Sequence, residues 1–93
     1  MTNLINKYGD VSGGYIFDFL DIGAHEYAEK LLGKCVTASA NIQYFLPLKN
    51  ETQLNNYKCE IVNSGNKTVT VNAFIKIEEK MAVMAVFTFV KIK

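Results

Sequence analysis

Two adjacent glycines, Gly13 and Gly14, begin the segment with the strongest helical pattern in this chain. Each glycine costs roughly 1 kcal/mol of helix propensity relative to alanine, so the pair is a poor helix start unless bare backbone is needed. A helix N-terminus presents unpaired N–H groups and partial positive charge, which glycines let a ligand oxygen approach closely. Asp21 follows two turns later in an apolar stretch, where a buried carboxylate is costly. Together these residues predict oxyanion donors and a buried carboxylate, which favours acyl chemistry.

The helix is predicted over residues 15–32, with Ser12 as its N-cap and Gly33 directly after its end. Apolar residues recur at steps of three and four along it, and others widen this stripe almost around the first half. Such a helix is buried on most sides. Before it, residues 1–5 are expected to form a short edge strand and residues 6–11 a loop.

The chain after Gly33 has the composition of strands, which are predicted over residues 35–46, 54–62, 67–78 and 81–92. A polar loop, a hairpin signal at residues 63–66 and a tight turn at residues 79–80 separate them. The last strand is almost continuously apolar, which is typical of a central strand covered on both faces. One long helix followed by four antiparallel strands predicts a single α+β domain over residues 1–93.

Composition limits the partners of this domain. Hydrophobic residues make up 49% of the 93, and a chain this short buries only about two-thirds of its unfolded surface. We therefore expect a second copy to cover part of the apolar surface. The net charge of +1, with scattered lysines and no arginine, gives no reason to expect nucleic-acid binding. No membrane span and no signal peptide are predicted, which favours a cytoplasmic protein.

The two cysteines, Cys35 and Cys59, lie in predicted strands without metal-ligand spacing. They are interpreted as reduced, small hydrophobic residues rather than as a disulfide. No metal site and no bound cofactor are predicted.

The spacing Asn6-x-x-Gly9-x-x-Ser12-Gly13-Gly14 resembles the N-x-x-G-x-x-H-G-G signature of the hotdog-fold acyl-CoA thioesterases of the PaaI-like group. In that signature an aspartate follows seven residues after the second glycine, as Asp21 does here. The segment from residue 36 to 47 is similar to the family's strand that ends in an aromatic residue and a proline. The resemblance covers nearly the whole chain and implies the hotdog fold, in which a curved antiparallel sheet wraps one long helix.

The chain departs from this family in two ways. The motif histidine is replaced by Ser12, which raises the question of catalytic efficiency or substrate class. The family's additional N-terminal helix and full first strand are expected to be absent from these 93 residues or reduced to a few of them, which would affect how the sheet edge and the substrate groove are closed.

The resemblance implies thioester hydrolysis at an interface between subunits. The amide of Gly13 or Gly14 would bind the oxyanion, and Asn6 would orient the carbonyl or the water. Asp21 of the partner's helix would act as general base or nucleophile, and Thr37 matches a position where related enzymes carry a hydroxyl near the reacting water. The substrate would be an acyl-CoA or a related thioester. The assembly would be a homodimer, or a tetramer formed by further pairing.

Each of these assignments has a structural alternative. Asp21 could be a helix-face carboxylate satisfied by local polar groups. The glycine pair could serve close packing of the helix against the sheet, and Thr37 could be an ordinary strand residue.

The neighbouring polar residues are given structural roles. His25 is expected to pair with Asp21 or Glu29, because Ser12 lies over three helical turns away and cannot complete a triad. Asn41 could bond across an interface or be a half-buried strand amide.

The rival function is a non-catalytic hotdog module that binds an acyl thioester or only dimerises.

Overall fold

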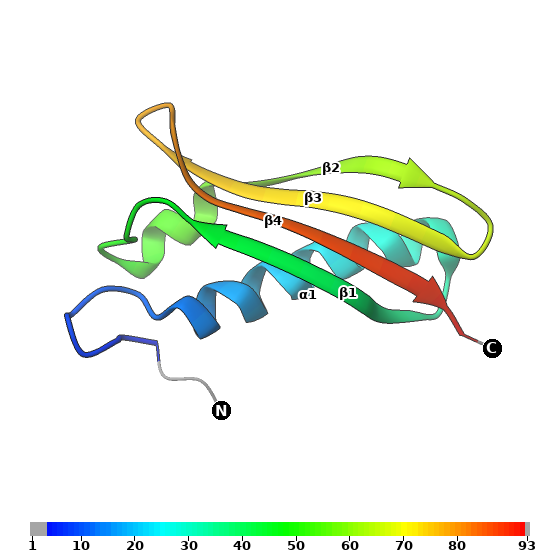
Figure 1. Ribbon diagram of the computed structural model, residues 1–93, viewed down its shortest axis with the longest axis horizontal. Helices are drawn as coiled ribbons and strands as arrows, with labels where there is room; N and C mark the ends of the chain where they lie inside the picture. Colours follow the sequence, from blue (N-terminus) through cyan, green and yellow to red (C-terminus); the bar gives the residue numbers. More distant parts are fainter. Residues whose placement is uncertain (1–3, 93) are drawn as a thin grey trace.

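A computed structural model describes residues 4–92 and confirms the predicted α+β architecture. Helix α1 (Gly13–Leu32) is followed by β1 (Cys35–Tyr44), the short 3-10 helix η1 (Glu51–Asn56), β2 (Tyr57–Ser64), β3 (Thr68–Ile77) and β4 (Lys80–Lys91). The four strands form one antiparallel sheet in the order β1-β4-β3-β2. The helix runs along one face of the curved sheet (Figure 1).

Both ends of α1 are capped as the sequence predicts. The Ser12 hydroxyl accepts a hydrogen bond of 3.1 Å from the Tyr15 amide. At the other end Gly33 adopts a φ of +77° and its amide donates to the Glu29 carbonyl. The helix therefore begins at Gly13, two residues earlier than predicted, because the glycines form part of its first turn.

The core lies between α1 and the inner faces of β3 and β4. It is formed by one side of the helix, including Leu20 and Ala24, and by alternate residues of both strands, including Val71 and Phe87, all fully buried. β4 is a central strand, as predicted, but it is not covered on both faces: buried residues from Val83 to Phe89 alternate with partly exposed ones, and Val86 is 38% exposed.

The helix approaches β2 closely at Gly23. A Cβ atom at Gly23 would lie 2.8 Å from Cε2 of Tyr57, which no side chain could occupy without displacing that ring. The Tyr57 ring also meets Phe19 edge to face at 5.1 Å between centroids. Gly23 is therefore a packing requirement of the interface between α1 and β2.

Two predicted strand boundaries are wrong for identifiable reasons. The strand predicted from residue 54 begins at Tyr57, because Asn50 and Gln53 form a capping box that folds the preceding residues into η1. β1 ends at Tyr44 instead of continuing to Leu46, because the Phe45 and Leu46 amides both donate to the Ala82 carbonyl. The chain turns away from the sheet at that point.

The predicted N-terminal edge strand does not join the sheet within the described residues. Ile5 forms an isolated antiparallel bridge to Val11, and the Ser12 amide donates to the Leu4 carbonyl. Residues 1–3 of that prediction lie outside the described residues.

Candidate functional site

The N-terminus of α1 presents backbone donors at the glycine pair. The first amides of a helix have no acceptor within the helix, and the Ser12 hydroxyl accepts a hydrogen bond from the Tyr15 amide. The amides of Gly13 and Gly14 therefore point out of the helix end, where the partial positive charge of the helix is greatest. This arrangement suits an oxyanion or another anionic ligand atom.

Tyr44, at the end of β1, covers one of the two glycines. Its hydroxyl donates to the Gly13 carbonyl at 2.5 Å, and a Cβ atom on Gly13 would lie 3.2 Å from Cζ of the ring. Burial, and then the negative charge of Asp18, raise the pKa of the Tyr44 hydroxyl, so it remains a donor at neutral pH. Close packing accounts for Gly13, whereas Gly14 is exposed.

Asn6 supports the loop before the helix. Its Oδ1 accepts hydrogen bonds from the Tyr8 amide at 2.9 Å and the Asp10 amide at 3.1 Å. The residue also borders a hollow of about 270 Å³ together with Gly13, Tyr44 and the apolar residues that follow β1. Asn6 therefore lies beside the helix start, with its carbonyl oxygen already occupied by the loop.

Asp21 and Thr37 lie in contact, although they are 16 residues apart. The Thr37 hydroxyl donates to Oδ1 of Asp21 at 2.8 Å, which joins α1 to β1. Asp21 is half-buried rather than buried as expected, and Thr37 is exposed on a strand at the edge of the sheet. The carboxylate is thus oriented by a hydroxyl while remaining open to solvent.

One chain alone does not bring the glycine amides and Asp21 to the same point. Gly14 and Asp21 are seven residues apart, which corresponds to about 10 Å along the helix axis. A thioester carbonyl bound at the glycines therefore lies out of reach of Asp21 in the same chain.

His25 has a partner that the sequence did not indicate. Its Nε2 lies 2.8 Å from the Cys35 carbonyl oxygen, and because a carbonyl can only accept, Nε2 is the donor. The ring also stacks on Phe89, with centroids 5.4 Å apart. The predicted pairing with Asp21 or Glu29 is wrong, because the ring bonds to Cys35 and stacks on Phe89 instead. These contacts attach the helix to the beginning of β1 and to β4.

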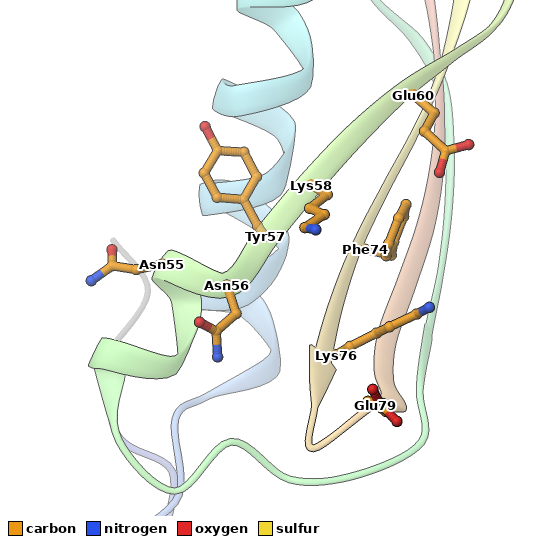
Figure 2. Close-up of a pocket in the computed structure, with 8 residues that line it drawn as sticks. All are labelled: Asn55, Asn56, Tyr57, Lys58, Glu60, Phe74, Lys76 and Glu79. Carbon is orange, nitrogen blue, oxygen red and sulfur yellow. The ribbon is translucent and has the colours of Figure 1, made fainter.

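A groove of about 580 Å³ lies elsewhere, beside η1 and the paired strands β2 and β3 (Figure 2). Its lining is mixed, with two lysines, two glutamates, two asparagines and two aromatic residues: Asn55, Asn56, Tyr57, Lys58, Glu60, Phe74, Lys76 and Glu79. None of the predicted catalytic residues borders it.

Within residues 4–92 no three histidine, cysteine, aspartate or glutamate side chains are grouped as metal ligands. Cys35 and Cys59 are both free thiols, as expected. No helix in the described part of the chain is both long and apolar enough to cross a membrane.

The comparisons with known proteins identify the family. The profile of the thioesterase superfamily matches residues 8–84. A comparison with curated proteins gives no significant match.

Solved structures share the fold along nearly the whole chain. A variant of the phenylacetic acid degradation protein PaaI from Thermus thermophilus is 19% identical, with a TM-score of 0.81 over 96% of this chain and 76% of its own. A hexameric thioesterase from Yersinia pestis is 22% identical, with a TM-score of 0.77 over 97% and 78%. A hypothetical thioesterase from Streptococcus pneumoniae, solved with coenzyme A, is 27% identical, with a TM-score of 0.75 over 94% and 70%. These matches confirm the predicted hotdog fold.

Proposed function

This chain belongs to the thioesterase superfamily, and we propose that it hydrolyses the thioester of an acyl-CoA, or a related thioester, at a site shared by two subunits. The observation that carries the proposal is the hydrogen bond from Thr37 to Asp21, which holds a solvent-accessible carboxylate beside the sheet edge. The structure with coenzyme A from Streptococcus pneumoniae supports the substrate class. A CoA substrate also fits the cytoplasmic location expected from the sequence.

The edge of β1 is the surface best suited to the shared site. No residue from Cys35 to Tyr44 carries a charged side chain, and exposed apolar residues such as Val36 lie along the strand. Charged side chains that lack an opposite charge across the pair discourage strand addition, so this uncharged edge is open to pairing with a second copy. Antiparallel pairing of two β1 strands would place both helices on the same face of the joined sheet. The helix start of one subunit would then approach Asp21 of the other.

We assign the chemistry to the two ends of this shared site. The exposed Gly14 amide, with or without that of Gly13, donates to the carbonyl oxygen and stabilises the negative charge that develops on it. Asp21 of the partner subunit, oriented by Thr37 at Oδ1, accepts a proton from water at Oδ2. The resulting hydroxide adds to the acyl carbon. The carbon–sulfur bond then breaks, and the sulfur leaves as the CoA thiol after taking up the proton. A nucleophilic role for Asp21 remains the second chemical route.

A non-catalytic module is the rival proposal, because Ser12 replaces the family's histidine. The two are distinguished by thiol release from a panel of acyl-CoAs. The enzyme requires release that falls at least about a hundredfold in kcat for Asp21→Asn, with folding retained. Asp18→Asn, one turn earlier on the same helix, is the matched control and should change the rate little. Saturable CoA binding without thiol release would favour the module.

A further inference from the structure

The edge of β2 is the second open edge of the sheet. Among residues 4–92, β2 pairs only with β3, and the residues before α1 pair with one another and with Leu48 rather than with this edge. Ile61 and Val62 are 40% and 62% exposed on it. An uncovered edge presents unpaired backbone N–H and C=O groups that can add another strand.

We propose that this edge binds β2 of a second copy of the chain, antiparallel and centred on Cys59. The regular part of the strand runs from Tyr57 to Ile61, because the register with β3 shifts between Ile61 and Asn63. Cys59 is the middle residue of that segment. A two-fold axis at Cys59 therefore uses the whole regular ladder.

The charges on the outer face match in this register. Lys58 lies opposite Glu60 of the partner subunit, and Glu60 lies opposite Lys58 of the partner subunit. Opposite charges on directly facing residues stabilise a strand pair, and like charges destabilise it. Moving the axis to Lys58 would place Lys58 opposite Lys58 of the partner subunit. Moving it to Glu60 would place Glu60 opposite Glu60 of the partner subunit. Those two neighbouring registers are therefore disfavoured.

The other face is also complementary. Tyr57 and Cys59 pack towards the core, and Ile61 lies on the same face by the alternation of the strand. The register places Tyr57 opposite Ile61 of the partner subunit, an aromatic and β-branched pair that favours strand association. A register that paired residues from different faces would expose these side chains. The two-fold register instead places core-facing residues opposite core-facing residues, and outer residues opposite outer residues.

The pairing would also extend the groove at this edge. Lys58 and Glu60 both border the groove of about 580 Å³. Figure 2 shows both side chains on β2, with the Phe74 ring beside them. In the paired assembly the grooves of two subunits meet across the axis.

Pairing at β2 does not depend on whether the protein hydrolyses thioesters. Combined with pairing at β1, it predicts an even number of subunits in any closed assembly.

Charge reversal tests the interface. Lys58→Glu and Glu60→Lys each place two like-charged pairs across the axis, and should weaken self-association at least about tenfold in sedimentation equilibrium. The double variant restores both pairs and should return to within about threefold of the wild type. Lys30→Glu, on the exposed side of α1, makes the same charge change as Lys58→Glu and should have no effect.

Which association step the charge reversals remove depends on whether β1 already forms a dimer. If β1 forms a dimer, the reversals remove the step from dimer to a larger assembly; otherwise they remove the step from monomer to dimer. Single reversals that leave every association step unchanged, or a double variant that fails to restore it, would overturn the proposal.

Cross-linking tests the register independently. Facing Cβ atoms lie about 4.5–5.5 Å apart, close to the separation in a disulfide. Burial raises the pKa of Cys59 to about 11, so a copper–phenanthroline catalyst is needed for oxygen to take two electrons and two protons from the facing thiols. The wild type and Cys35→Ser should form a Cys59–Cys59 bond identified by mass spectrometry, and Cys59→Ser should not. Absence of that bond in the wild type would overturn the register.

Discussion

The hydroxyl of Thr37 determines how the Asp21 carboxylate is presented. It donates to Oδ1 at 2.8 Å, which leaves Oδ2 as the oxygen available to a water molecule. A hydrogen bond in which the acceptor is a carboxylate has a defined geometry, so it favours one orientation of the Asp21 side chain. The bond also crosses from α1 to β1, so it couples the position of the carboxylate to the edge at which we propose the dimer.

Removing this hydroxyl should slow hydrolysis without unfolding the protein. Thr37→Val is expected to lower kcat about tenfold or more, because Asp21 loses its orienting donor, while Thr37→Ser should retain most activity. Thr70→Val is the matched control. The Thr70 hydroxyl lies 3.1 Å from that of Thr88, on the face of the sheet that points away from α1 and Asp21. Steady-state thiol release measures the rates. Equal activity of Thr37→Val and the wild type would remove Thr37 from the site.

The two glycines should respond differently to alanine. Gly13→Ala forces the Tyr44 ring to move, so we expect a lower urea midpoint as well as a lower rate. Gly14→Ala lies at an exposed position, where alanine is neutral or stabilising by up to about 1 kcal/mol. If the Gly14 amide binds the thioester oxygen, its methyl group should nevertheless remove most hydrolysis. A fully active Gly14→Ala variant would place the oxyanion donors elsewhere.

The sequence indicated individual site residues better than their partners. The resemblance selected Asp21 and Thr37, which the structure brings into contact. It did not reveal the Tyr44 ring over Gly13 or the bond from His25 to the Cys35 carbonyl. Both contacts join the helix to a strand, so their partners depend on how α1 lies against the sheet. No spacing within one element contains that information.

At the scale of elements, local signals located the segments, and tertiary contacts set several of their ends. The Ser12 cap and Gly33 bound the helix as predicted because both act within one turn. The end of β1 depends instead on the Ala82 carbonyl, on a strand almost 40 residues later. The start of β2 was displaced by the capping box at Asn50, a local signal hidden within residues that also have strand character.

The hairpin between β3 and β4 contains an unfavourable pair of turn residues. Glu78 and Glu79 both have positive φ, at 51° and 69°, between the paired residues Ile77 and Lys80. Two-residue turns of this kind prefer asparagine and glycine, because side chains with a Cβ cost roughly 1 kcal/mol or more in this region.

Glu79→Gly should therefore stabilise the protein by about 1 kcal/mol, measured by urea unfolding. Glu29→Gly, within α1, is the control for loss of a glutamate side chain and should destabilise by a similar amount. A lower midpoint for Glu79→Gly would show that the turn does not strain the native backbone.

At the scale of the whole molecule, the distance along α1 is the reason for proposing a site shared by two copies. The glycine amides and Asp21 of one chain are separated by about 10 Å, whereas a general base and an oxyanion donor must reach one carbonyl group. The uncharged β1 edge offers the pairing that brings these groups together. Composition predicted a second copy from the apolar fraction, but which edge it uses follows only from the placement of Thr37 and the strand order.

A shared site predicts complementation between two inactive variants. In a mixed dimer of Asp21→Asn and Gly14→Ala, one site combines an intact Gly14 from the first chain with an intact Asp21 from the second, and the other site contains both substitutions. Random assembly makes half of the dimers mixed, so refolding equal amounts together should recover about a quarter of wild-type activity. Each variant refolded alone controls for residual activity, and sedimentation checks that the dimer has re-formed. Recovery no greater than the mean of the two variants, with dimers present, would mean that each site lies within one chain. The separation along the helix would then have to be closed by movement of the substrate or of α1, and not by the partner subunit.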